Sequence, residues 1–325
     1  METFQNHPLA PYTTVKIGGP ADTLILTHTT EEFIEVLNRQ SEENNFSERN
    51  ERESADNVFF RAQSSEVHTE GREHEKKSLS SLSILGNGSN VLISDSGIRG
   101  TVIKNQASSI QYLSNNQIKV DSGVQLPLLI TDTINHSLSG LEEFAYIPST
   151  IGGAIYGNIH GFNKNDFDKF LESIEIFDLQ TKSIKQILPN ELNWDYDYSQ
   201  FQDNPHWIIL STTLNLTPGD PSASKQLVTD IIAKKITTQS MNSLGSVFKN
   251  PPSDSAGRII DQELGLKGFR IGDAQISPKH ANFIVNLGKA TATDYFALVR
   301  HVQSLAKSKL NINMEPEIKF LGDFD

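Results

Sequence analysis

Two glycine-rich turns constrain the fold of this chain more than any other feature of its sequence. Residues 85–94 read LGNGSNVLIS after an apolar, strand-like run, and residues 147–161 read IPSTIGGAIYGNIHG. Small residues let backbone N–H groups approach a phosphate closely. Neither turn has the spacing of a P-loop or of a Rossmann fingerprint. Together they favour a long ligand such as a dinucleotide, with tight turns that serve packing alone as the alternative.

Composition excludes several kinds of function. The net charge of −12 argues against a nucleic-acid partner, because binding to phosphates requires clustered Lys and Arg. The absence of cysteine excludes disulfides, thiolate metal ligands and a Cys nucleophile. The histidines show no paired spacing, so the sequence predicts no metal site. The sequence has no signal-peptide pattern, and no apolar run approaches the length of about 20 residues that spans a membrane, so we expect a cytoplasmic protein. We also expect a monomer.

The 325 residues predict two domains of α+β type, with strands grouped early and helices late. A capping-box spacing at Thr29 and Glu32 predicts a helix start. The TPGDPSASK stretch predicts a boundary between residues 217 and 218. Further elements are expected as follows: strands over 22–27 and 206–216, hairpins over 109–123 and 173–188, and helices over 127–140 and 291–310.

Residues 41–78 interrupt this pattern. The segment is dense in Glu, Ser, Asn and Arg and has little to bury, which is typical of a disordered insertion. A docking segment around NVFFRA, residues 57–62, is the alternative.

Two other stretches carry chemistry. Residues 245–252, GSVFKNPP, place a Ser, a Lys and an Asn in a rigid loop suited to a polar ligand or a proton transfer, and no G-x-S-x-G elbow is present. Residues 314–322, MEPEIKFLG, predict that Glu315 and Glu317 point to the same side of an extended chain. A solvated pair of glutamates is the alternative.

Taken in order, these motifs resemble one family, the UDP-N-acetylenolpyruvoylglucosamine reductases (the MurB family) of peptidoglycan synthesis. Within the stretch over residues 256–268, Glu263 is an insertion of one residue relative to the family pattern. Seven stretches carry the resemblance: residues 12–22, 85–103, 147–158, 245–251, 256–268, 276–286 and 315–322.

The resemblance implies an FAD-binding module of vanillyl-alcohol-oxidase type with two subdomains over residues 1–217, and a substrate domain over 218–325. It implies FAD and NADPH as cofactors, with hydride transfer from the flavin to the enolpyruvyl C3 of UDP-N-acetylglucosamine enolpyruvate. The residues on matching cofactor-binding positions are Gly86, Asn87, Gly88, Ser89, Asn90, Pro148, Ser149, Thr150, Gly152, Gly153, Ala154 and Asn158.

By the same resemblance, Ser246 is the proton donor to the substrate C2, and Glu317 is a second catalytic acid. A serine hydroxyl is a poor acid in water, so this role requires polarisation by its neighbours. The matching substrate-binding positions are Tyr196, Lys249, Asn250, His280 and Asn282.

The chain departs from the family pattern F-x-Y-R-x-S-x-F, because Asp197 occupies the place of a catalytic arginine. A carboxylate there would repel the anion that the arginine stabilises. Arg258 and Arg270 are the candidates to replace it, and His160 stands where the family prefers glycine. The alternatives are therefore a flavin- or UDP-sugar-binding homologue with weakened or lost catalysis, and an oxidase on the same fold.

Overall fold

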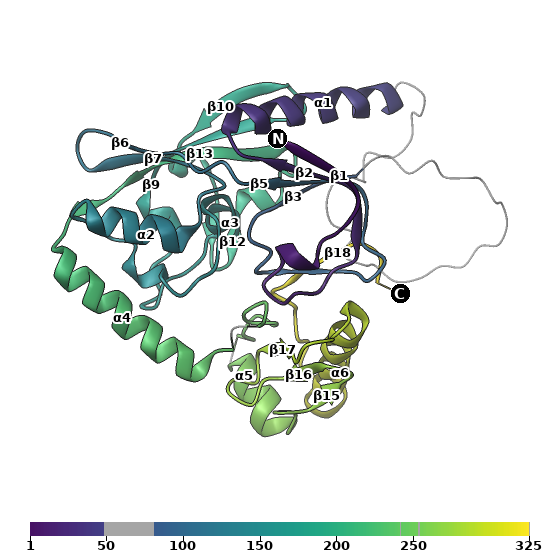
Figure 1. The fold of residues 1–325 in the computed structure, drawn as a ribbon. Helices are drawn as coiled ribbons and strands as arrows, with labels where there is room; N and C mark the ends of the chain where they lie inside the picture. Colours follow the sequence, from purple (N-terminus) through teal and green to yellow (C-terminus); the bar gives the residue numbers. More distant parts are fainter. Residues whose placement is uncertain (49–80, 241, 253, 325) are drawn as a thin grey trace.

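The computed structural model describes residues 1–48, 81–240, 242–252 and 254–324. The first sheet has the strand order β1-β2-β5-β3, in which β1 is antiparallel to β2 and the other pairs are parallel (Figure 1). These strands are β1 (Glu2–Pro8), β2 (Pro20–Thr27), β3 (Ser81–Leu85) and β5 (Ile98–Asn105).

The second sheet is antiparallel throughout and has the order β10-β9-β13-β7-β6. Its two hairpins and its central strand confirm the predicted strand pattern. The strands are β6 (Ile110–Tyr112), β7 (Gln117–Asp121), β9 (Leu171–Asp178), β10 (Ser183–Ile187) and β13 (Trp207–Asn215). Helix α2 (Leu126–Asn135), also expected, buries its apolar residues against this sheet.

Helix α1 (Thr30–Glu48) joins the two sheets, because Phe33 and Leu37 pack against apolar residues of both. The helix continues through residues 41–48, so the prediction of a disordered insertion from residue 41 was wrong at its start. Ser41 is buried and its hydroxyl donates to the carbonyl of Asn38, which lets a polar sequence extend the helix. Residues 49–78, with the NVFFRA stretch, lie outside the described residues.

The second glycine-rich stretch is not wholly a loop, because α3 (Ile151–Gly157) forms within it. The Thr150 hydroxyl caps this helix by accepting from the N–H of Gly153, at 3.3 Å. A Cβ on Gly152 would lie 3.0 Å from the Cβ of Ser122, so glycine allows the helix to approach the end of β7. The small residues, which predicted a turn, therefore allow a short helix to pack closely against the end of β7.

In the C-terminal part, α5 and α6 pack around a three-stranded antiparallel sheet, whereas α4 lies against α2. Helix α6 confirms the predicted helical face, because Tyr295, Leu298, Val299 and Val302 are buried. The elements are α4 (Pro221–Thr238), α5 (Ala256–Arg258), β15 (Arg270–Ile271), β16 (Ala274–Ile276), β17 (Ile284–Asn286) and α6 (Ala292–Leu310).

The extra residue Glu263 ends a single turn of π-helix, Ile259–Glu263. The N–H of Leu264 donates to the carbonyl of Ile259 at 3.0 Å, a bond between residues five apart. A π-turn holds one residue more than an α-helical turn, so it absorbs the inserted residue at the end of this short helix. The insertion is therefore accommodated locally.

Short elements complete the fold. They are η1 (Ala10–Tyr12), β4 (Val91–Ile93), β8 (Leu138–Ser139), η2 (Glu142–Phe144), η3 (Phe167–Phe170), η4 (Pro189–Glu191), β11 (Trp194–Asp195), β12 (Tyr198–Ser199), η5 (Gln200–Gln202), β14 (Thr217–Pro218) and β18 (Lys319–Leu321). Within the described ranges, no helix is both long enough and apolar enough to cross a bilayer.

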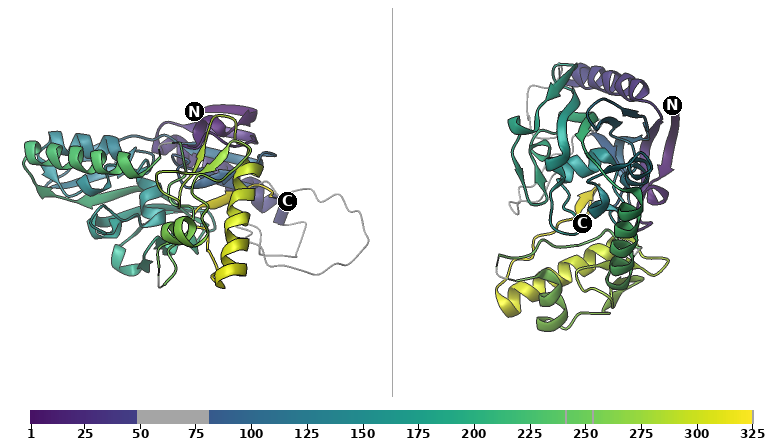
Figure 2. Two further views of the ribbon diagram at one scale, coloured as in Figure 1. Left: turned by 90° about the horizontal axis from the view of Figure 1, so that it is seen from below. Right: turned by 90° about the vertical axis from the view of Figure 1, so that its left-hand side faces the viewer.

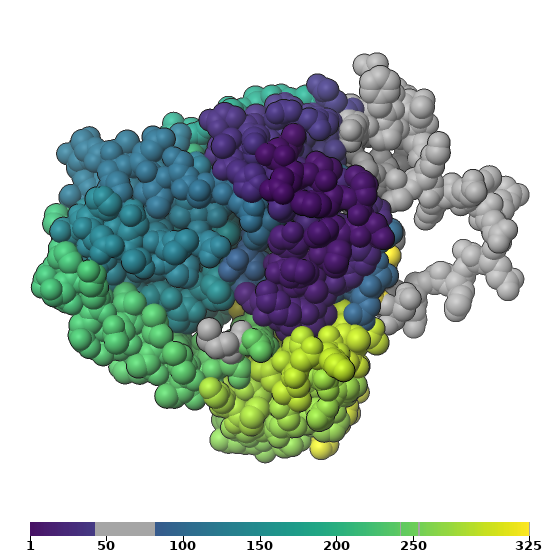
Figure 3. All heavy atoms as spheres, viewed as in Figure 1, coloured from purple at the N-terminus to yellow at the C-terminus, as the bar shows by residue number. Residues whose placement is uncertain are grey.

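The chain returns to its N-terminal half at its end. Strand β18 pairs in parallel with β4, and Figure 2 shows the yellow C-terminal strand among the N-terminal elements. The Thr14 hydroxyl also donates to the carbonyl of Ser243, and the Asn286 amide donates to the carbonyl of Val15. These contacts hold the C-terminal lobe against the first sheet, as the space-filling view shows (Figure 3).

Candidate active site

The two predicted catalytic residues, Ser246 and Glu317, lie on adjacent extended segments. The N–H of Glu317 donates to the carbonyl of Val247 at 2.8 Å, and the N–H of Lys249 donates to the carbonyl of Glu315 at 2.9 Å. Phe248 and Pro316 face each other between these bonds. Antiparallel pairing therefore brings the backbone segments that carry Ser246 and Glu317, far apart in sequence, next to each other.

Asn282 holds the segment that follows Ser246. Its side-chain amide donates to the carbonyl of Phe248 at 2.8 Å, and its side-chain oxygen accepts from the N–H of the same residue at 3.0 Å. Asn282 is 4% exposed. A buried amide with both ends bonded to one backbone residue fixes the loop. This geometry supports a positioning role for Asn282, and its predicted contact with substrate stays a prediction.

Three other predicted substrate residues surround this loop. The Asn250 side-chain oxygen accepts from the N–H of Ala256 at 2.9 Å, and the His280 Nδ1 accepts from the N–H of Asn282 at 3.3 Å. Burial lowers the pKa of His280. The Lys249 ammonium pairs with Glu315 at 2.6 Å on the exposed side of the segment. Of the three, Lys249 is best suited by its charge to a ligand phosphate.

Glu317 and Glu315 have different surroundings, so they are not a solvated pair. Glu315 is exposed beside Lys249, whereas Glu317 is partly buried. Burial, and then the charge of Asp197, raises the pKa of Glu317 to about 8, although Lys249 and Lys319 oppose the shift. Glu317 is therefore mostly protonated at neutral pH and able to donate a hydrogen bond.

Asp197 lies at the tip of a two-residue hairpin between β11 and β12, with φ of 54°. Aspartate tolerates this left-handed conformation better than most residues do. The backbone carbonyl of Asp197 accepts from Gln202 at 3.0 Å, and the Gln202 oxygen accepts from the Lys319 ammonium at 3.2 Å. The hairpin tip is thereby tied to β18, the strand that follows Glu317.

The side chain of Asp197 faces His160. Its Oδ1 lies 3.1 Å from the imidazole Nδ1. The Tyr196 ring stacks on the imidazole with centroids 4.5 Å apart, and its hydroxyl lies 3.3 Å from Nε2. The sequence marked His160 only as a departure from glycine. Its partnership with Asp197 depends on a contact between two loops and has no local sequence signal.

Neither candidate arginine joins this cluster. Arg258 is held by Asp254 and Glu263, and Arg270 by Asp273, in ion pairs on the surface of the C-terminal lobe. These are short-range pairs within their own segments. Replacement of the family arginine by Arg258 or Arg270 is therefore not supported.

The two glycine-rich stretches lie against each other. The Asn87 side-chain amide donates to the carbonyl of Pro148 at 2.9 Å, and a Cβ on Gly86 would lie 2.8 Å from the Thr150 hydroxyl oxygen. Gly88 has φ of +61°, and a Cβ there would lie 2.3 Å from the carbonyl oxygen of Tyr12. A larger residue at Gly86 would force the two stretches apart, and one at Gly88 would push the turn away from Tyr12.

The first turn has the donors that a pyrophosphate requires. Among the described residues, none accepts a hydrogen bond from the N–H groups of Asn87, Gly88 or Ser89. Behind the turn, the ammonium of Lys104 donates to the carbonyl of Gly86 and is 7% exposed. Burial lowers the pKa of Lys104 to about 8. Free N–H groups in front of a buried cation fit an anionic group such as the diphosphate of FAD.

The second stretch contributes mainly through packing. Ala154 is fully buried, and the Ser149 hydroxyl donates to the carbonyl of Thr150. The Asn158 amide donates to the carbonyl of Asp195, and its oxygen accepts from the N–H of Asp168. Asn158 thus holds the hairpin that carries Asp197. The cofactor contacts predicted for this stretch stay predictions.

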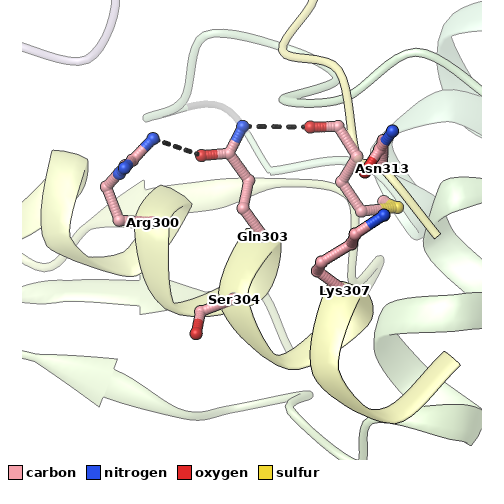
Figure 4. Close-up of a pocket in the computed structure, with 6 residues that line it drawn as sticks. Arg300, Gln303, Ser304, Lys307 and Asn313 are labelled. Atoms are coloured by element: carbon pink, nitrogen blue, oxygen red, sulfur yellow. Dashed lines mark hydrogen bonds between the residues drawn. The ribbon is translucent and has the colours of Figure 1, made fainter. Parts of the chain in front are cut away.

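The turn and the catalytic segment are directly connected. The Asn90 side chain donates to the carbonyl of Glu317 at 3.4 Å, and the carbonyl of Asn90 accepts from the N–H of Lys319 at 2.9 Å. A cavity of about 440 Å³ lies elsewhere, on α6 (Figure 4). Its lining includes Arg300 and Lys307 but none of the predicted site residues. The candidate active site is therefore the region between the first turn, Glu317 and the Asp197 hairpin.

Comparison with known proteins identifies the family. Residues 237–321 match the family model of the UDP-N-acetylenolpyruvoylglucosamine reductase C-terminal domain, and residues 59–182 match that of an FAD binding domain. The UDP-N-acetylenolpyruvoylglucosamine reductases of Carboxydothermus hydrogenoformans and Listeria monocytogenes are 32% and 34% identical to this chain. Each alignment covers 98% of this chain and 94% of the relative.

A solved structure agrees. The crystal structure of the reductase from Thermus caldophilus superimposes with a TM-score of 0.74 at 31% identity, covering 99% of this chain and 98% of that one. The predicted α+β fold, with an FAD-binding module and a C-terminal domain, is confirmed. With its sequence, its fold and the geometry of its site in agreement, this chain belongs to the UDP-N-acetylenolpyruvoylglucosamine reductase family.

Proposed function

We propose that this chain reduces UDP-N-acetylglucosamine enolpyruvate to UDP-N-acetylmuramate, with NADPH as reductant and FAD as bound cofactor. The observation that supports the proposal is the backbone pairing of the segment after Ser246 with the Glu317 segment, beside the first glycine-rich turn. The names of the relatives support the same reaction. We place the reaction in the cytoplasm of a cell that builds a peptidoglycan wall, where it serves cell shape and division.

Different residues are suited to the cofactor and to the substrate. The N–H groups of Asn87, Gly88 and Ser89, with Lys104 behind them, would hold the diphosphate of FAD. When bound, FAD accepts hydride from NADPH and supplies it to the enolpyruvyl carbon C3. Lys249 is suited to a phosphate of the UDP group. The side chains of the site must then stabilise the negative charge that forms at C2 and supply a proton to C2.

Hydride addition at C3 leaves negative charge on C2 and its carboxylate. The hydroxyl of Ser246 supplies the proton to C2, and the neutral carboxyl of Glu317 donates a hydrogen bond to the developing enolate. The raised pKa of Glu317 supports this role, because an ionised carboxylate would repel the enolate.

The visible spectrum of the purified protein tests for flavin. Anaerobic mixing with NADPH and then with the enolpyruvyl substrate tests the reaction. Expected is bleaching of the flavin by NADPH and its return on adding substrate. A flavoprotein that NADPH reduces but the substrate does not reoxidise would instead be the binding homologue. Oxygen consumption with substrate in the absence of NADPH would indicate an oxidase.

Ser246→Ala tests the assigned proton donor. Turnover should fall by about 10³-fold or more with flavin content unchanged, because no other hydroxyl is assigned to C2. Ser243→Ala is the matched control, since the Ser243 hydroxyl donates to the carbonyl of Ser240 three residues away. Equal losses in the two variants would contradict the assignment.

We also propose the domain division at residues 217 and 218 and a monomeric state. Mass measurement in solution checks the second, and limited proteolysis checks the first.

A further inference from the structure

The buried carboxylate of Asp197 requires compensation that the site supplies from an unexpected residue. The Asp197 side chain is 13% exposed, and its Oδ2 has no hydrogen-bond partner among the described residues. Its Oδ1 lies 3.1 Å from Nδ1 of His160, whose side chain is 28% exposed. A buried carboxylate without a donor or cation costs several kcal/mol. The imidazole of His160 is a basic group that lies against this carboxylate.

Two groups lie against the imidazole, and a third contact holds the backbone of His160. The Asp197 Oδ1 lies 3.1 Å from Nδ1, which makes no hydrogen bond among the described residues, and the Tyr196 ring covers one face. The Tyr146 hydroxyl donates to the backbone carbonyl of His160 at 3.5 Å. A carboxylate at one ring nitrogen orients the other nitrogen toward a ligand. Here that other nitrogen, Nε2, lies 3.3 Å from the Tyr196 hydroxyl, at the more exposed edge of the cluster.

The cluster belongs to the site of Glu317. The Tyr196 pKa is raised by burial and then by both Asp197 and Glu317, so the phenol is within electrostatic reach of both carboxyl groups. Gln202 links the backbone of Asp197 to Lys319, two residues after Glu317. A substrate carboxylate that reaches Glu317 can therefore also reach the edge formed by Tyr196 and His160.

We propose that His160 contacts the substrate: its Nε2–H binds the carboxylate of the enolpyruvyl group, and Asp197 is the positioning residue that orients the ring. The inference rests on the proposed function. The Nε2–H group donates to the substrate carboxylate, while the Asp197 carboxylate lies 3.1 Å from the other ring nitrogen. Asp197 then supports anion binding through His160, although its own charge has the wrong sign.

The test compares two ligands on the FAD-loaded enzyme. UDP-N-acetylglucosamine enolpyruvate has the carboxylate, and UDP-N-acetylglucosamine does not. His160→Phe should weaken binding of the first by about tenfold or more and of the second by less than about twofold. In stopped-flow experiments, reoxidation of reduced flavin by the enolpyruvate should slow by about 100-fold, while reduction by NADPH stays within about twofold.

A second His–Asp–Tyr arrangement on α2 provides the control. The His136 Nδ1 lies 3.8 Å from Asp132, and the His136 ring stacks on Tyr112 with centroids 3.9 Å apart. His136→Phe removes the same groups outside the site and should leave both ligands and both half-reactions unchanged. His160→Gln, which keeps a donor of similar reach without charge, replaces His160→Phe if the latter loses flavin.

The role of Asp197 is tested by a double-mutant cycle. Asp197→Asn should slow reoxidation in the wild type by about tenfold but by less than about twofold in the His160→Phe background, because its effect passes through the ring. Equal effects in the two backgrounds would show an independent role and overturn the positioning assignment.

The outcomes separate the two proposals. If reduced wild-type flavin is not reoxidised by the enolpyruvate, the proposed function fails. If wild type turns over but His160→Phe binds and reoxidises like wild type, only the inference about His160 fails. Equal loss of both UDP-sugars in His160→Phe would also overturn it, since the contact would then not be with the carboxylate.

Discussion

Glu317 and Asp197 bring two carboxyl groups into one site from opposite ends of the fold. Burial, and then the charge of Asp197, raises the pKa of Glu317 to about 8. Glu317 lies in the segment paired with Val247, whereas Asp197 lies at the tip of the β11–β12 hairpin. The site thus keeps one of the two carboxyls protonated near neutral pH and places the other against an imidazole.

Glu317→Gln should change the pH dependence of stability. A carboxyl whose pKa is higher in the folded state stabilises the fold fully below its unfolded pKa of 4.5, and that stability is lost as pH rises toward 8. Glutamine cannot ionise, so the variant should gain about 2 kcal/mol relative to wild type between pH 5 and pH 8. Urea unfolding at both pH values measures this difference.

Glu315→Gln is the matched control for that experiment. Glu315 is exposed and paired with Lys249. Exposed pairs contribute about 0–1 kcal/mol, so its stability difference between the two pH values should stay small. A Glu317→Gln profile parallel to that of wild type would show that Glu317 is ionised in the folded protein.

Lys104→Met should weaken FAD binding by about tenfold or more, because the buried ammonium behind Gly86 would no longer attract the diphosphate. An anion at the turn favours the charged amine, so FAD binding by wild type should also weaken as pH rises above about 8, the pKa of Lys104. Titration of apoprotein with FAD, followed by flavin fluorescence, gives both results.

Lys119→Met removes the same charge from β7, where the ammonium pairs with Glu175 at 2.7 Å. Its FAD affinity should match that of wild type. If both lysine variants lost affinity equally, net charge rather than the position of Lys104 would be responsible.

Gly88→Ala should destabilise the fold and abolish FAD binding. Its φ of +61° disfavours alanine, and the added Cβ would lie 2.3 Å from the Tyr12 carbonyl oxygen, which is backbone and cannot rotate away. Gly265→Ala separates the two causes, because Gly265 has φ of +66° with nothing within 4 Å of the Cβ position. We expect a loss of about 1 kcal/mol for Gly265→Ala and at least about 3 kcal/mol for Gly88→Ala, measured by urea unfolding.

Asp197→Arg tests how the chain tolerates the family residue. In the wild-type background the new guanidinium would lie beside the His160 imidazole and remove its orienting carboxylate, so turnover should not rise. In the His160→Phe background the same change should recover part of the lost reoxidation rate, since it restores a cation at this edge. A gain in turnover from Asp197→Arg alone would mean that His160 does not supply the missing charge.

Much of the site could be predicted from sequence because its pieces are local. The first glycine-rich turn, the Ser246 loop and the Glu317 segment each have a residue pattern that depends on neighbouring positions, and the order of these patterns identified the family. The single extra residue Glu263 was also visible in the sequence. That it forms a π-turn was not, since this depends on whether the surrounding helix packs well enough to keep its register.

Other features required the folded chain. Residues 41–48 are polar, and only the extension of α1 shows that they continue a helix. In the sequence, Asp197 stands where the family has an arginine and His160 where it prefers glycine, and no local pattern links these two departures. The sequence by itself determined the family, the α+β architecture and the residues of the first turn, because those follow from local patterns. Tertiary structure alone decided that Asp197 and His160 lie 3.1 Å apart, because a contact between two loops depends on how the whole chain packs and not on either loop's sequence.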